Sequence, residues 1–140
     1  MRLREVKGLK ETTEFDEQLE HAINYTLFMI TQTHFWHWQT KSYASHTALG
    51  NYYETLQEKV DEVAEAFMGS GGDFKSTPSG EFKPFSKDVA VKELNNFKST
   101  LAGYETTLMQ DENKNFHGVG DKILEIVQET DKLLYLLTLE

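Results

Sequence analysis

The sequence predicts an all-α protein, a bundle of four long helices. Apolar residues recur every three or four positions in four segments, and alternating strand patterns are almost absent. Both prolines, Pro78 and Pro84, fall in one stretch between the second and third of these segments. A chain of 140 residues is long enough to bury one core and too short for two domains. We therefore expect a single domain over residues 1–140.

The first two helices are predicted from the signals at their ends. Thr13 suits an N-cap, and acidic residues follow it where the helix dipole favours carboxylates, so helix one is expected to start there and run to Gln39. After a short turn, Ser45 is the expected cap of helix two. That helix is expected to continue to Met68 and to stop at the run Gly69-Ser-Gly-Gly.

The second half of the chain is predicted to be one long loop followed by two helices. Residues 69–86 are rich in Gly, Ser, Pro and Lys, which indicates a loop, and three rings are expected to pin it to the bundle: Phe74, Phe82 and Phe85. Helix three is expected to follow Ser86, and helix four follows a polar turn. Four helices of about 25 residues, joined by short, long and short connections, form a ferritin-like four-helix bundle. Its one long crossover connection joins helices two and three.

The composition limits the possible functions. A formal net charge of −9 argues against nucleic-acid binding, and the basic residues of the N-terminal arm (1–12) are typical of an ordinary solvated terminus. The absence of cysteine excludes disulfides, thiolate zinc sites and iron–sulfur clusters, which leaves nitrogen and oxygen ligands for any metal. Since no signal peptide and no membrane-spanning run is evident, we expect a cytoplasmic protein with no membrane partner.

A cluster of metal-ligand residue types lies in the first half of the chain. Three of the five histidines, His34, His37 and His46, fall within thirteen positions, and Asp61 and Glu65 follow at i, i+4 spacing. Imidazole and carboxylate together suit a divalent metal, iron in particular. Two alternatives stay open: the carboxylates form a solvated acidic face, and His34 is a buried, hydrogen-bonded structural residue. The flanking tryptophans, at positions 36 and 38, are expected to be packing anchors.

Helical periodicity predicts that the two groups of ligands come from different subunits. Asp61 and Glu65 fall away from the apolar stripe of helix two, so they do not point into their own core. Helix one is apolar on more than one face and therefore needs more than one partner, which indicates burial against a second subunit. An acidic face beside such a surface is a place where histidines of one chain meet carboxylates of another.

The same residues resemble the signature of the Dps family, the ferritin-like DNA-binding proteins from starved cells. The resemblance is strongest from about Tyr25 to Gly72. In that family, two histidines of one subunit and the Asp and Glu of a symmetry mate form a ferroxidase centre. The resemblance implies that His37 and His46 are the histidine ligands, that Asp61 is the bridging aspartate and that Glu65 is the neighbouring glutamate.

The resemblance also implies a function and an assembly. The protein is expected to oxidise Fe(II) with hydrogen peroxide or dioxygen, to sequester the iron and to protect against oxidative damage. Zinc is an alternative occupant of the same ligands, and His34 is a candidate support residue beside them. The expected assembly is a homo-oligomer, from a dimer up to a dodecameric shell. The negative net charge and the lack of a long lysine-rich tail lead us to expect weak or no DNA binding.

Two departures from the family pattern keep a second hypothesis open. The turn between His37 and His46 is a few residues shorter than usual and lacks a Gly-x-x-Phe element, and residues 69–86 lack the amphipathic segment that the family places at its dimer interface. The alternative is a divergent Dps- or ferritin-like helical structural or assembly protein with weak or no ferroxidase activity.

Overall fold

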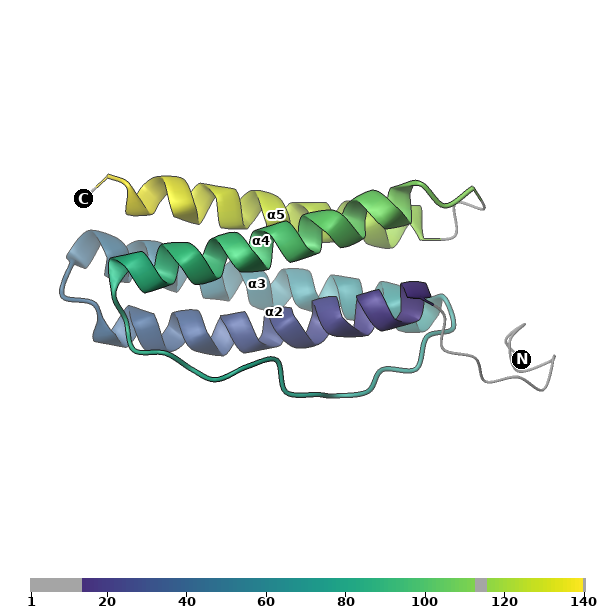
Figure 1. Ribbon diagram of the computed structural model, residues 1–140, viewed down its shortest axis with the longest axis horizontal. Helices are drawn as coiled ribbons and strands as arrows, with labels where there is room; N and C mark the ends of the chain where they lie inside the picture. The colour runs from purple at the N-terminus through teal and green to yellow at the C-terminus, as the bar shows by residue number, and fades with distance from the viewer. Residues whose placement is uncertain (1–13, 113–115, 140) are drawn as a thin grey trace.

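The protein is a bundle of four helices with no strand among the residues that the structure describes, 14–112 and 116–139 (Figure 1). This computed structural model contains α2 (Glu14–Gln39), α3 (Tyr43–Gly69), α4 (Lys87–Met109) and α5 (His117–Leu137). The predicted all-α four-helix bundle is confirmed. The N-terminal arm (1–12) and the predicted cap Thr13 lie outside the described residues.

Each of the four helices packs against two others, so that the contacts form a closed ring. Helix α2 packs on α3 and α4, and α5 packs on the same two helices from the other side. Figure 1 shows that α3 and α4 run in the same direction, opposite to α2 and α5. The segment 70–86 therefore returns along the length of the bundle, where it lies beside α2 (Figure 1).

Two serines cap the central helices. Ser42 accepts a hydrogen bond from the backbone N–H of Ser45 at 3.2 Å, and Ser86 accepts one from Val89 at 3.1 Å. Helix three begins directly after Ser86, as predicted, whereas the predicted cap at Ser45 is wrong. Ser45 lies buried in the first turn of α3, because the Ser42 hydroxyl reaches the N–H three residues ahead and starts the helix at Tyr43.

The apolar stripe predicted for helix two lies in the core. Its buried members are Leu49, Tyr52, Leu56, Val60, Val63 and Phe67. Tyr53 and Ala64, at the margin of the stripe, are half-buried. No helix among the described residues has the length and apolar character needed to cross a membrane.

Hydrogen bonds from buried amide side chains of α2 hold the segment 70–86 in place. Asn24 donates to the carbonyl of Lys75 at 2.9 Å and accepts from the N–H of Thr77 at 3.1 Å. Gln32 makes the same kind of pair with the backbone of Lys83, donating at 3.1 Å and accepting at 2.7 Å. Polar groups on α2 thus satisfy the backbone of a segment that has no secondary structure.

The three phenylalanines of this segment differ in how deeply they are buried. Phe74 and Phe85 pack against the core, as predicted. Phe82 remains 48% exposed and stacks on Phe28 of α2, with ring centroids 4.7 Å apart. Phe82 also contacts Phe35 of α2 edge to face, at a centroid distance of 5.0 Å. All three rings therefore attach the segment to the bundle, two of them at the core and Phe82 at the surface of α2.

Candidate metal site

The turn between α2 and α3 brings two of the predicted ligands together. His37 lies in the last turn of α2 and His46 in the first turn of α3. Their rings stack with centroids 3.7 Å apart and planes 18° from parallel, and both side chains are half-buried. The short turn thus places both imidazoles at the same end of the bundle.

The backbone hydrogen bonds of these two rings are reciprocal. Nδ1 of His37 lies 2.5 Å from the carbonyl oxygen of His46, and Nδ1 of His46 lies 2.8 Å from the carbonyl oxygen of His37. Because a carbonyl oxygen only accepts, each Nδ1 carries a proton and donates. In a neutral imidazole the other nitrogen, Nε2, then keeps a free lone pair. Metal-binding histidines in proteins are commonly held in this way.

His34 belongs to an aromatic layer beside this pair. Its ring stacks on Tyr53 at a centroid distance of 4.1 Å and contacts Trp38 at 4.3 Å, whereas the centroid of His37 is 6.2 Å away. The side chain is half-buried. Packing holds His34 next to the two histidines, and its ring is not stacked with either of them.

The two tryptophans of α2 differ in burial. Trp36 is fully buried, which confirms its predicted role as a packing anchor, and its Nε1–H donates to the carbonyl of Lys83 at 2.8 Å. The same prediction for Trp38 is wrong, since this side chain is 64% exposed. Two residues rotate a helix by about 200°, so Trp38 faces away from the core that Trp36 enters.

The predicted carboxylates lie elsewhere in the chain. Asp61 and Glu65 are exposed on α3, which confirms that they point away from their own core. Asp61 follows His46 by fifteen residues on one straight helix, and these residues span about 22 Å along its axis. Within residues 14–112 and 116–139, no three His, Cys, Asp or Glu side chains converge to hold a metal ion. One chain brings the histidines together and leaves the carboxylates apart from them.

Ion pairs occupy the side of α3 that faces α5. Lys59 pairs with Glu125 at 3.2 Å, and the hydrogen bond and charge of that carboxylate raise the pKa of Lys59. Glu62 lies 3.7 Å from Lys122. Among the described residues, Asp61 and Glu65 have no such basic partner. Their carboxylates are accessible to a ligand from outside the chain.

Gly50 is a site residue that the pattern of ligand types does not reveal. A Cβ atom at this position would lie 2.9 Å from Cε1 and 3.1 Å from Nδ1 of His37. The ring of His37 therefore rests on the bare backbone of α3. One signal in the sequence pointed here: a glycine inside a helix, one turn after His46, where it is about 1 kcal/mol less favourable than alanine.

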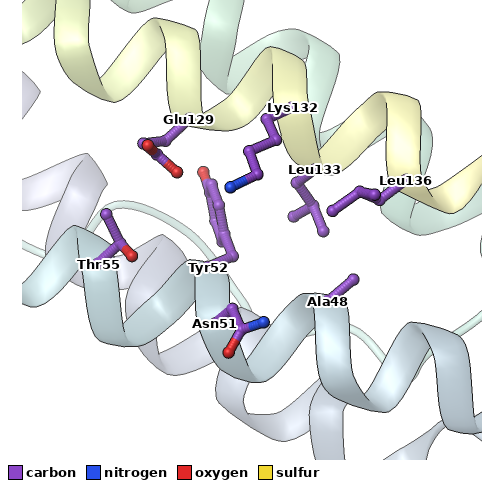
Figure 2. Close-up of a pocket in the computed structure, with 8 residues that line it drawn as sticks. All are labelled: Ala48, Asn51, Tyr52, Thr55, Glu129, Lys132, Leu133 and Leu136. Carbon is purple, nitrogen blue, oxygen red and sulfur yellow. The ribbon is translucent and has the colours of Figure 1, made fainter.

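A small pocket lies between α3 and α5, away from the histidines. Figure 2 shows the ring of Tyr52 directed across it toward α5, with Glu129 and Lys132 beside it. Its volume is about 50 Å³. That space accommodates a few water molecules but not an organic substrate, because ligand pockets are usually several times larger.

The described residues form an all-α four-helix protein in which two of the predicted ligands, His37 and His46, lie together. Residues 37–137 match a family described as a family of unknown function, DUF5856, and the chain belongs to this family. The matched region begins at His37 and includes all four predicted ligands.

The chain is also similar to an uncharacterized protein of Haemophilus influenzae. The two are 26% identical over 143 residues, and the alignment covers 90% of this chain and 87% of that protein. No solved structure matches the chain.

Proposed function

We propose that this protein is a Dps-like protein that binds Fe(II) between subunits, oxidises it and sequesters the product, which protects against oxidative damage. The observation that carries the proposal is the pair His37 and His46. Both rings are half-buried, both Nδ1 atoms are committed to backbone carbonyls, and both Nε2 atoms keep their lone pairs for a metal ion.

The proposed architecture is ferritin-like, with the segment 70–86 as the crossover connection between α3 and α4. Two features support it. The two helices run in the same direction, and the segment travels beside α2 along the length of the bundle (Figure 1). A bundle with one long connection is the arrangement in which ferritin-like proteins build metal sites.

The proposed site needs the carboxylates of a second copy, so the active form is a homo-oligomer, from a dimer up to a dodecameric shell. The separation of His46 and Asp61, about 22 Å along α3, supports this because no single chain closes it. Exposed aromatic side chains flank the histidines: Trp38 is 64% exposed and Tyr43 is 82% exposed. Large exposed aromatics grouped in this way are typical of protein interfaces.

The ligand chemistry suits iron as a substrate. Neutral imidazole and carboxylate bind Fe(II), and anionic oxygen ligands favour Fe(III). In the proposed site the partner's Asp61 bridges or anchors the ion, and the partner's Glu65 completes the ligand set. His37 and His46 contribute Nε2. A metal ion binds in the plane of an imidazole and these two rings are stacked 18° from parallel, so they turn apart to reach one ion. Hydrogen peroxide or dioxygen accepts the electrons. Zinc binds the same types of ligand and competes for the site.

A second candidate function is a helical structural or assembly protein with weak or no ferroxidase activity. One observation favours it. The reciprocal hydrogen bonds and the stacking of His37 on His46 join the end of α2 to the start of α3. The same pair of residues can therefore have a structural role, which is to hold the end of α2 against the start of α3.

Anaerobic titration with Fe(II), followed by addition of peroxide, separates the two functions. For the iron protein we expect saturable binding and rapid oxidation, with affinity at least about tenfold weaker in Asp61→Ala. Glu54→Ala is the matched control, because Glu54 is an exposed carboxylate two turns earlier on the same helix. Absence of saturable binding at stoichiometric iron in the unaltered protein would contradict the iron function and favour the structural one.

A further inference from the structure

The close contact between Gly50 and His37 limits the positions that the imidazole ring of His37 can adopt. A Cβ atom at position 50 would meet three atoms of the imidazole, Cε1 at 2.9 Å, Nδ1 at 3.1 Å and Nε2 at 3.8 Å, and these are its nearest neighbours. The first distance is shorter than two carbon atoms tolerate. Any side chain at Gly50 therefore requires the ring of His37 or one of the two helices to move.

The ring of His37 has little room to move, because it is held on its other sides. Nδ1 donates to the carbonyl of His46 at 2.5 Å, and one face stacks on the His46 ring at 3.7 Å. The ring of Tyr53 stands nearly perpendicular to it, at a centroid distance of 5.5 Å and an angle of 76°. A methyl group at position 50 would push on the edge that carries Nδ1, which is the edge that makes the hydrogen bond.

We propose that Gly50 is a positioning residue for His37. Because Gly50 has no side chain, the imidazole of His37 can lie close enough to the backbone of α3 for Nδ1 to donate a hydrogen bond to the carbonyl of His46. That hydrogen bond keeps the proton on Nδ1 and the lone pair on Nε2. This inference rests on the proposed function, since the lone pair matters only if Nε2 binds a metal. The geometry of the contact does not depend on that function.

Gly103 supplies a control. A Cβ atom at Gly103, inside α4, meets nothing within 4 Å. Alanine is a better helix former than glycine, so Gly103→Ala is expected to raise the Tm. At Gly50 the same gain in helix propensity is opposed by the contact with His37, and the two substitutions should differ in sign.

The test combines Gly50→Ala and Gly103→Ala with an intact His37 and with His37→Ala. We expect Gly50→Ala to lower the Tm when His37 is present and to raise it when His37 is replaced, whereas Gly103→Ala raises it in both backgrounds. In ¹⁵N NMR spectra of the imidazoles, His37 should be the Nδ1–H tautomer in the unaltered protein and a mixture in Gly50→Ala. Fe(II) affinity should fall at least about tenfold in Gly50→Ala and stay unchanged in Gly103→Ala.

The readouts separate failure of this inference from failure of the proposed function. If the unaltered protein binds Fe(II) and Gly50→Ala keeps both the affinity and the tautomer of His37, the positioning role is overturned and the iron function stands. If the unaltered protein binds no Fe(II), the proposed iron function is wrong. The NMR and Tm results then test, without the Fe(II) data, whether Gly50 positions His37. If Gly50→Ala does not fold, recovery of folding in the double variant with His37→Ala supports the inference, and no recovery overturns it.

Discussion

Among single residues, Tyr52 shows how burial affects the protonation of a side chain. Its hydroxyl lies 2.7 Å from Oγ1 of Thr130, whose own proton is donated to the carbonyl of Ile126 at 2.9 Å. Tyr52 is therefore the donor. Complete burial raises the pKa of Tyr52 far above its ordinary value of 10.0, although the hydrogen bond with Thr130 acts in the opposite direction.

This shift predicts a loss of stability in alkali. Above about pH 10 the unfolded chain releases the tyrosine proton and the folded chain retains it, so the free energy of unfolding decreases as the pH rises. Below that pH the contribution is fully present. Urea unfolding between about pH 8 and pH 11 measures the decrease. Tyr52→Phe should show a shallower decrease, and Tyr135→Phe, which alters a 62% exposed ring, should follow the unaltered protein.

Among the helices, α2 both packs into the core and binds the backbone of the segment 70–86. Four of its side chains form hydrogen bonds with the backbone of that segment: Asn24, Gln32, Trp36 and Gln39. They replace the sheet or helix partners that the segment lacks. The segment is thereby held along α2, although its composition is that of a loop.

Gln32→Leu tests this attachment. Leucine fills a similar volume but leaves the N–H of Lys83 without its acceptor, while the carbonyl of Lys83 keeps its bond from Trp36. We expect the free energy of unfolding to fall by about 1–3 kcal/mol and hydrogen exchange at Lys83 to accelerate. Gln57→Leu is the control, because Gln57 is exposed on α3, and it should stay within about 0.5 kcal/mol. Unchanged exchange at Lys83 would refute the proposed attachment.

At the scale of the whole molecule, the proposed site exists only between copies. His46 and Asp61 lie about 22 Å apart along α3, so the chain that supplies the histidines cannot also supply the carboxylates to the same ion. A symmetric contact between two copies generates two such sites, each with histidines from one chain and carboxylates from the other.

Mixing two defective variants tests this division. His37→Ala and Asp61→Ala should each bind Fe(II) at least about tenfold more weakly, so that neither fills the site at the Fe(II) concentration that saturates the unaltered protein. After both are unfolded together and refolded at equal amounts, about a quarter of the original sites should return, because half of the pairs are mixed and each mixed pair holds one intact site. The Fe(II) stoichiometry measures the recovery, and unmixed samples treated alike are the control. No recovery in samples shown by native mass spectrometry to contain mixed oligomers would rule out a shared site.

Patterns along the chain were enough to predict the helices, most of the buried stripe on α3 and the residues proposed as ligands. These features are local, because periodicity, caps and breakers act over a few residues, and the start of helix three after Ser86 was predicted in this way. The same local reasoning chose Ser45 instead of Ser42, since both serines lie near the helix start and only the backbone geometry distinguishes them.

Which of those residues come into contact depends on how the helices pack. His37 and His46 stack because α2 and α3 fold back on each other, and their tautomers follow from carbonyls on the opposite helix. The contact of Gly50 with His37 and the bonds of Gln32 to Lys83 likewise join separate elements. No pattern along the chain encodes such contacts, because they depend on how the helices pack in three dimensions.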